Sequence, residues 1–308
     1  MKLLIIKLGV FFTISLAIVT YVLMNYGGNV DFFYEKFTTP KTNSMIIGDS
    51  RSFQGIHPEV VDKYFEDQGF DLPMLNYSFT IGQAIMGPLY NASIFAKLKD
   101  SSSKNGIFII SITPEMLTSH KDYDNEKGEF REEGQPPHNM KFVDVNPNYE
   151  YLIKNLTFFH FKGAFKKKTT VYKNGRLEES NLPENEEVFK LWKKNQIDLF
   201  LEDSKDLKLS NTRIKGLGDL ITGLKERGNV FLIRMPISKE FLSNEDKYYP
   251  RFGHIVDSIA DTKKIEYIDF NSIGKEYNTY DGHHIDKFAG KEFTKALCDL
   301  ILNSVKLK

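Results

Sequence analysis

The stretch Ser44-Met45-Ile46-Ile47-Gly48-Asp49-Ser50-Arg51-Ser52 decides the fold of this chain. Its first four residues form a short apolar run, which is typical of a strand buried on both faces. Gly48 ends the run, and the residues around Ser50 are expected to begin a helix. A buried strand that passes directly into a helix is the repeating unit of parallel α/β sheets.

The same order of strand and helix recurs along the rest of the chain. Apolar runs predict four further strands, at 74–79, 107–112, 230–235 and 265–269. Apolar residues at helical spacing predict helices at 58–68, 84–98, 210–226 and 287–305. This alternation predicts a doubly wound, flavodoxin-like α/β fold, with a parallel five-stranded sheet and helices on both of its faces.

One segment interrupts this order. Residues 115–209 separate the third strand from the next predicted helix, and a structureless loop of that length is improbable in a compact domain. A helix is expected within it at about 187–200. We therefore interpret 115–209 as an insertion, or cap, that lies over the C-terminal edge of the sheet. The run Lys166 to Lys168 inside it is interpreted as a solvated charged face.

The N-terminal residues have the character of a membrane span. Residues 8–26 carry no charge, and at 1.5 Å per residue they extend about 28 Å, close to the thickness of the bilayer core. Lys2 and Lys7 precede them, so the positive-inside rule keeps the N-terminus in the cytoplasm. A cleaved signal peptide and a buried core helix are the alternatives. We predict an uncleaved signal anchor at 1–27, a juxtamembrane linker at 28–42 and an extracytoplasmic α/β domain at 43–308.

The charge balance and the cysteine count exclude other classes of protein. Lys plus Arg and Asp plus Glu both total 41. A nucleic-acid-binding protein normally carries a basic excess, so no nucleic-acid partner is expected. Cys298 is the single cysteine, which rules out a disulfide within the chain.

Gly48-Asp49-Ser50 is the first motif that suits catalysis. A doubly wound sheet places its ligands at the C-terminal ends of the strands. A serine at the start of a helix there has a backbone N–H free of intrahelical bonding, and the helix dipole favours an anion beside it. This arrangement suits a nucleophile whose substrate oxygen becomes an oxyanion. The alternative is that Asp49 or Ser50 simply caps the helix.

The second motif, Tyr280-Asp281-Gly282-His283-His284, stands just before the last predicted helix. A serine nucleophile needs a general base, and the base needs a carboxylate to orient it. One turn can join Asp281 to His284. The alternatives are a helix cap, or a metal cluster that also includes His283 and Asp286. Because consecutive histidines rarely point the same way, we expect no metal here, and no cofactor is indicated.

Together the two motifs resemble the SGNH, or GDSL-type, hydrolase superfamily. The resemblance covers about 44–302, interrupted by the insertion. It implies that Ser50 is the nucleophile, His284 the base and Asp281 the residue that orients the base. The second block of that family supplies a glycine whose backbone N–H helps to bind the oxyanion, and Gly82 is its counterpart here.

The third block of the family differs in this chain. It normally carries an asparagine that donates to the oxyanion, whereas this chain has Ser111-Ile112-Thr113-Pro114. Either the Thr113 hydroxyl donates in its place or the donor is absent. The loss of one such donor costs about 10²–10³ in rate.

The missing asparagine, the membrane span and the insertion together narrow the resemblance to membrane-anchored SGNH-like proteins of bacterial envelopes. These include the proteins of teichoic acid D-alanylation and exopolysaccharide O-acetylation. The resemblance implies a location at the bacterial cytoplasmic membrane, a membrane-bound O-acyltransferase as partner, and a glycan or lipid-linked glycan as substrate. The acyl group and the choice between hydrolysis and transfer are left open. The alternative is a non-catalytic partner or scaffold of such a system.

Two arginines are candidates for substrate binding. Arg51 follows the proposed nucleophile and can pair with an anionic substrate, or it is a solvated charge in the first turn of the helix. Arg234 ends the fourth predicted strand, so it is expected to face the same cleft, or to pair with a carboxylate.

Overall fold

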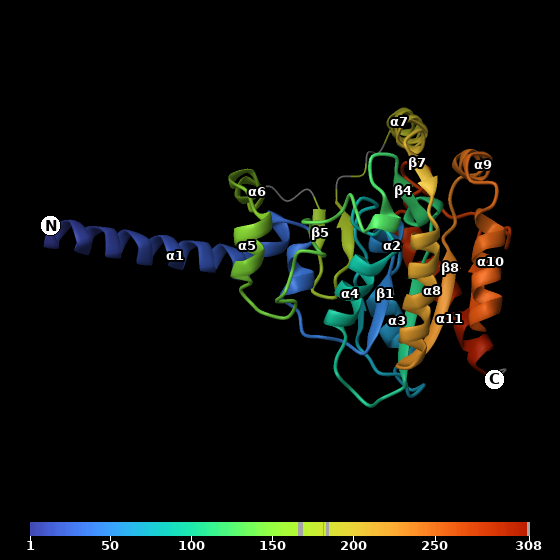
Figure 1. Ribbon diagram of the computed structural model, residues 1–308, viewed down its shortest axis with the longest axis horizontal. Coiled ribbons are helices and arrows are strands. Elements are labelled where there is room, and N and C mark those ends of the chain that lie inside the picture. Colours follow the sequence, from blue (N-terminus) through green and yellow to red (C-terminus); the bar gives the residue numbers. More distant parts are fainter. Residues whose placement is uncertain (166–168, 181, 183–184, 307–308) are drawn as a thin grey trace.

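Five parallel strands form the centre of the domain in a computed structural model, which describes residues 1–165, 169–180, 182 and 185–306 (Figure 1). The strand order is β2-β1-β3-β8-β9, and each neighbouring pair is parallel. The strands are β1 (Ser44–Ile47), β2 (Met74–Asn76), β3 (Gly106–Ser111), β8 (Gly228–Arg234) and β9 (Glu266–Asp269). The predicted doubly wound α/β fold is confirmed.

Helices cover both faces of the sheet, and successive residues of a strand pack against opposite faces. Met45 and Ile47 of β1 belong to one buried cluster, with residues of α4 (Pro88–Lys97), α8 (Asn211–Lys225) and α10 (Phe252–Lys263). Ile46 belongs to the other, with residues of α3 (Pro58–Phe65) and α11 (Lys287–Lys306). Burial on both faces explains why the central strands β1 and β3 are continuous apolar runs in the sequence.

The two ends of the insertion lie side by side. After β3, a 3₁₀ turn η2 (Pro114–Leu117) leads into β4 (Thr118–His120), which pairs antiparallel with β7 (Leu207–Leu209). Between these strands lie η3 (Asn125–Lys127), α5 (Tyr149–Asn155), α6 (Phe158–Gly163), the hairpin β5 (Thr169–Val171) and β6 (Leu177–Glu179), and α7 (Glu186–Ser204). The run Lys166 to Lys168, expected to be a solvated face, lies outside the described residues.

The N-terminal helix α1 (Lys2–Val30) projects from the side of the domain (Figure 1). Its 29 residues are long and apolar enough to cross a membrane, and a signal sequence has the same character. Most of its side chains are exposed, and burial begins at Leu23.

The segment 28–42 differs from the linker that we expected. Helix α1 continues through it to Val30, and the 3₁₀ helix η1 (Tyr34–Phe37) then packs into the core. The Tyr34 ring lies so close to Gly27 that a Cβ there would be 2.3 Å from it. The buried Lys36 donates from Nζ to the carbonyl oxygens of Asn76 and Gly175, at 2.6 Å each. Aromatic packing and these hydrogen bonds therefore make the segment part of the domain.

Two helices between β8 and β9 did not emerge from the sequence, namely α9 (Lys239–Tyr248) and α10. The short helix α2 (Ser50–Gly55) follows β1 directly, as expected. The predicted helix at 84–98 begins only at Pro88, because Gly87 before it has a φ of 143°, which is outside the helical range.

Candidate active site

Ser50 is presented at the C-terminal end of β1 by a tight turn. Gly48 has a φ of 155°, and a Cβ on it would lie 2.7 Å from the carbonyl oxygen of Ser111. The Asp49 carboxylate caps α2 by accepting the backbone N–H of Arg51 at 3.0 Å. Because Asp49 supplies the cap, the side chain of Ser50 remains available for other contacts.

The structure brings Asp281, His284 and Ser50 into one hydrogen-bonded line. The Nδ1 atom of His284 is 2.6 Å from Asp281 Oδ2, and its Nε2 atom is 2.8 Å from Ser50 Oγ. The other carboxylate oxygen of Asp281 accepts the backbone N–H groups of His283 and His284 at 3.2 and 2.9 Å. The ring of Tyr280 stacks on His284, with the centroids 5.5 Å apart. The loop is therefore held by both its backbone and its side chains.

Electrostatics favour an ionised carboxylate in this line. Burial alone would raise the pKa of Asp281, but the charge and hydrogen bond of His284 outweigh it and hold that pKa well below its usual value. A charged Asp281 keeps the proton of His284 on Nδ1 and leaves Nε2 free to accept one from Ser50. The arrangement has the geometry of a nucleophile, a base and an orienting carboxylate.

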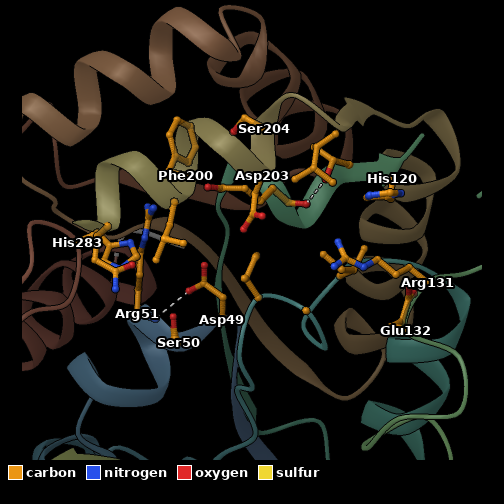
Figure 2. Close-up of a pocket in the computed structure, with 18 of the residues that line it drawn as sticks. Asp49, Ser50, Arg51, His120, Arg131, Glu132, Phe200, Asp203, Ser204 and His283 are labelled. Carbon is orange, nitrogen blue, oxygen red and sulfur yellow. Dashed lines mark hydrogen bonds between the residues drawn. The ribbon is translucent and has the colours of Figure 1, made fainter. Parts of the chain in front are cut away.

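A cavity of about 230 Å³ opens beside Ser50. Figure 2 shows Asp49, Ser50 and Arg51 on one side of it and Phe200 and Asp203 of α7 on the opposite side. The insertion helix α7 therefore lines the space above the C-terminal end of β1.

Two backbone N–H groups are available at this cavity. Gly82 lines it together with Ser50, and the Gly82 N–H makes no hydrogen bond within the described part of the chain. Ser50 is the first residue of α2, where a backbone N–H has no intrahelical partner. Both can donate to an oxygen held beside Ser50.

Thr113 is engaged elsewhere, contrary to the expectation that its hydroxyl can bind an oxyanion. The buried Oγ1 of Thr113 donates to Asp49 Oδ2 at 3.0 Å, and the residue is not part of the cavity lining. The carboxylate is the stronger acceptor, so it takes the hydroxyl. Thr113 thus supports the cap of α2.

Arg51 is neither solvated nor free. Its guanidinium lies at the cavity wall, is buried, and forms an ion pair with the buried Glu245 of α9. Burial disfavours the charge, but Glu245 and Asp49 outweigh that effect and raise the pKa of Arg51. The Nη1 atom has no hydrogen-bond partner among the described residues.

Arg234 does not reach the cavity. Its Nη2 atom lies 3.0 Å from Glu245 and 2.9 Å from Asp246, and it is absent from the lining residues. The expectation that Arg234 faces the cleft and binds substrate is therefore wrong. The alternative expectation, that Arg234 pairs with a carboxylate, agrees with the structure. Glu245 joins both arginines, and nothing in the sequence around it indicated this contact.

Glu115 and His283 are cavity residues to which the sequence assigned no catalytic function. Burial and the nearby charge of Glu245 raise the pKa of Glu115 to about 8. Burial and the neighbouring His284 hold the pKa of His283 well below its ordinary value. His283 stacks on Phe241 of α9, with the centroids 4.7 Å apart. At neutral pH both side chains are therefore uncharged.

Asp281, His283 and His284 also place possible metal ligands within 4.8 Å of one another. The expectation that consecutive histidines diverge is wrong here, because their ring centroids are 4.0 Å apart. Asp286 does not join them and instead accepts the backbone N–H groups of Phe288 and Ala289. Both ring nitrogens of His284 already contact Asp281 and Ser50, so a metal ligated by His284 would displace one of these contacts.

Comparison with known proteins gives weak structural likeness only. No family model and no curated protein matches the chain. A carbohydrate acetylesterase from Sinorhizobium meliloti superposes with a TM-score of 0.39 at 9% identity, covering 84% of this chain and 98% of that one. An arylesterase described as putative, from Agrobacterium tumefaciens, superposes with a TM-score of 0.38 at 9% identity, covering 84% of this chain and 98% of that one. An aryl esterase from M. smegmatis superposes with a TM-score of 0.38 at 9% identity, covering 84% of this chain and 97% of that one. These values are too low for the activities of those proteins to be transferred to this chain.

Proposed function

We propose that the chain is a membrane-anchored serine acyl hydrolase or acyltransferase of SGNH type. The observation that carries this proposal is the line of contacts from Asp281 through His284 to Ser50, at 2.6 and 2.8 Å. The order of the residues in the chain, with serine after the first strand and Asp-x-x-His before the last helix, supports the assignment to that superfamily.

In the proposed reaction Ser50 Oγ attacks the carbonyl carbon of an acyl ester while Nε2 of His284 takes its proton. The negative charge that develops on the carbonyl oxygen is stabilised by the backbone N–H groups of Ser50 and Gly82. The protonated His284 then gives its proton to the departing alcohol, which leaves an ester between the acyl group and Ser50. A water molecule or a second hydroxyl, deprotonated by His284, attacks this ester and frees Ser50.

The proposed acceptor is a hydroxyl of an envelope glycan or a lipid-linked glycan. Support comes from the apolar helix α1, which we propose crosses the bacterial cytoplasmic membrane with its N-terminus inside and the domain outside. A membrane-bound O-acyltransferase is the proposed partner, since an anchored domain can receive acyl groups delivered across the bilayer.

Active-site labelling of the full chain in detergent tests the proposal. A fluorophosphonate probe reacts with an activated serine, and intact mass counts the adducts. We expect one adduct, lost in both Ser50→Ala and His284→Ala. The matched control is Ser52→Ala, because Ser52 lies two residues along α2 with its hydroxyl bonded to Ser78 at 2.8 Å. No adduct on folded protein would refute the enzymatic function.

A second candidate, a non-catalytic scaffold with the same fold, is favoured by one observation. The hydroxyl of Thr113 is bonded to Asp49, so it does not donate at the position where the family has an asparagine. The same labelling separates the candidates, since a scaffold that binds glycan without turnover leaves Ser50 unlabelled.

A further inference from the structure

Apolar side chains gather on the surface around the point where α1 enters the domain. Among the described residues that follow α1, seven of the fifteen exposed large apolar side chains fall within 142–165. Six of these define what we call the α5–α6 patch: Phe142, Val145, Tyr149, Ile153, Phe158 and Phe159. Helices α5 and α6 lie at the end of the domain from which α1 projects (Figure 1).

The patch is fixed to a defined level of α1. The hydroxyls of Thr20 and Tyr149 are 2.6 Å apart, which ties the start of α5 to the helix. Helix α6 also packs against α1. The carboxylate of Asp31, just past the helix, lies 3.7 Å from Nε2 of His160 in α6.

The free part of α1 is too short to keep the domain clear of a bilayer. Side chains from Lys2 to Ile18 are almost all exposed, whereas Val19 and Thr20 begin the contact with the domain. Seventeen residues of helix extend about 26 Å, and the hydrocarbon core of a bilayer is about 30 Å thick. If α1 crosses the membrane, the face that bears the patch must therefore lie in the headgroup region.

We propose that the α5–α6 patch inserts into the outer membrane–water interface beside α1. This inference rests on the proposed function insofar as it requires α1 to be a membrane anchor. The composition of the patch fits that position, because tyrosine is favoured at the headgroup level and large apolar side chains such as phenylalanine are typical of segments that insert into the interface. Lys162 lies over the Phe158 and Phe159 rings, 5.4 and 5.1 Å from their centroids, where its ammonium can reach lipid phosphates while its stem covers apolar surface.

The lipid bilayer is favoured over a protein as the occupant of this patch. Helices α5 and α6, which carry most of the patch, lie beside the base of α1, and lipid must contact α1 at that level as soon as the helix spans the membrane. The domain is then held at two points, by α1 and by the patch, and Ser50 is kept at a constant height above the membrane. A second copy of the chain or a membrane protein partner remains an outcome of the test.

Depth-dependent fluorescence quenching in vesicles provides the test. The full chain is reconstituted at low protein density in vesicles of phosphatidylcholine and phosphatidylglycerol, with and without lipids that carry a nitroxide near the headgroup. Single cysteines at Phe159→Cys and Ile153→Cys carry an environment-sensitive fluorophore. Cys298 is buried and does not compete for the label. The matched control is Phe288→Cys, because Phe288 and Phe159 are both 76% exposed and Phe288 is at the start of α11.

We expect quenching of about twofold at both patch positions and almost none at Phe288→Cys, since an interfacial side chain lies within reach of the nitroxide. A label at Ile14→Cys separates the two proposals. Quenching at Ile14→Cys without quenching at the patch would overturn this inference and leave the membrane anchor standing. No quenching at any of these positions would overturn the anchor and this inference together, while the serine labelling would be unaffected. Quenching at the patch that is absent at the higher protein density and appears only when the protein is diluted further would assign the patch to a second copy instead.

Discussion

Replacing Glu115 by Gln tests the electrostatics of the cavity beside Ser50. Glu115 is half-buried, and its Oε2 atom is inaccessible and has no hydrogen-bond partner among the described residues. Burial and the charge of Glu245 raise the pKa of Glu115 from its ordinary value of 4.5 to about 8. The carboxyl is therefore protonated in the folded protein at neutral pH and ionised in the unfolded chain.

The sign of the effect follows from proton linkage. Stability falls with rising pH wherever the folded protein holds more protons than the unfolded chain. For Glu115 this condition holds from about pH 4.5 to about pH 8, between the pKa values of its unfolded and folded states. Between about pH 5.5 and about pH 7.5 the linkage amounts to about 2.5 kcal/mol of lost stability. Gln has nearly the same shape and does not ionise, so Glu115→Gln is free of this loss.

Urea unfolding of the full chain in detergent, followed by Trp192 fluorescence, measures the effect. Trp192 lies in α7 and its ring contacts Tyr280 at 6.2 Å between centroids, so it reports on the cap over the site. We expect the stability of Glu115→Gln relative to the natural chain to increase by about 2 kcal/mol from the lower pH to the higher. Comparing two pH values cancels any packing effect of the amide. The same pH dependence in both proteins would refute the reasoning.

Three further substitutions test the site. In Asp281→Asn an amide replaces the carboxylate that orients the imidazole, and we expect kcat on a chromogenic ester to fall about 10⁴-fold with little change in KM; an unchanged kcat would contradict the assignment. Thr113→Val removes the hydroxyl donated to Asp49, and urea unfolding is expected to give a loss of about 1–3 kcal/mol. Labelling of the serine in that variant should change less than about tenfold, and a loss of about 10²-fold or more would show that Thr113 binds the oxyanion after all. Gly48→Ala places a Cβ 2.7 Å from the Ser111 carbonyl oxygen, so we expect no folded protein by circular dichroism, and a folded, labelled variant would show that the turn can relax.

The central strands could be predicted from the sequence because the sheet is buried on both faces there. Such strands are uninterrupted apolar runs, of which 107–112 is the clearest, and they need no knowledge of their neighbours. Helix α9 has little apolar periodicity in its sequence, because it is rich in charged residues and only Phe241 and Glu245 in it are buried. Helix α10 carries a clearer pattern, because Phe252, Val256 and Ala260 are spaced by four and all buried, although only the structure shows that this segment is a helix.

In the candidate site, contacts between residues close in sequence could be predicted, whereas contacts between distant residues could not. Asp281 and His284 are three residues apart, so one loop is enough to join them. The environment of Arg51 could not be predicted, because its partner Glu245 is 194 residues away and lies on a helix that the sequence did not reveal. The hydrogen bond of Thr113 to Asp49 joins the ends of two neighbouring strands, and only the register of the sheet brings them together.

The packing of η1 connects α1 mechanically to the candidate site. Lys36 Nζ lies 4.0 Å from the centre of the Phe53 ring in α2, and Phe33 stacks on the same ring with the centroids 6.1 Å apart. Helix α2 begins at Ser50, so an unbroken series of packed groups leads from the base of α1 to the proposed nucleophile. Among the described residues, each group in that series contacts the next. We therefore expect a tilt of α1, or tension along it, to be transmitted to the helix that carries Ser50.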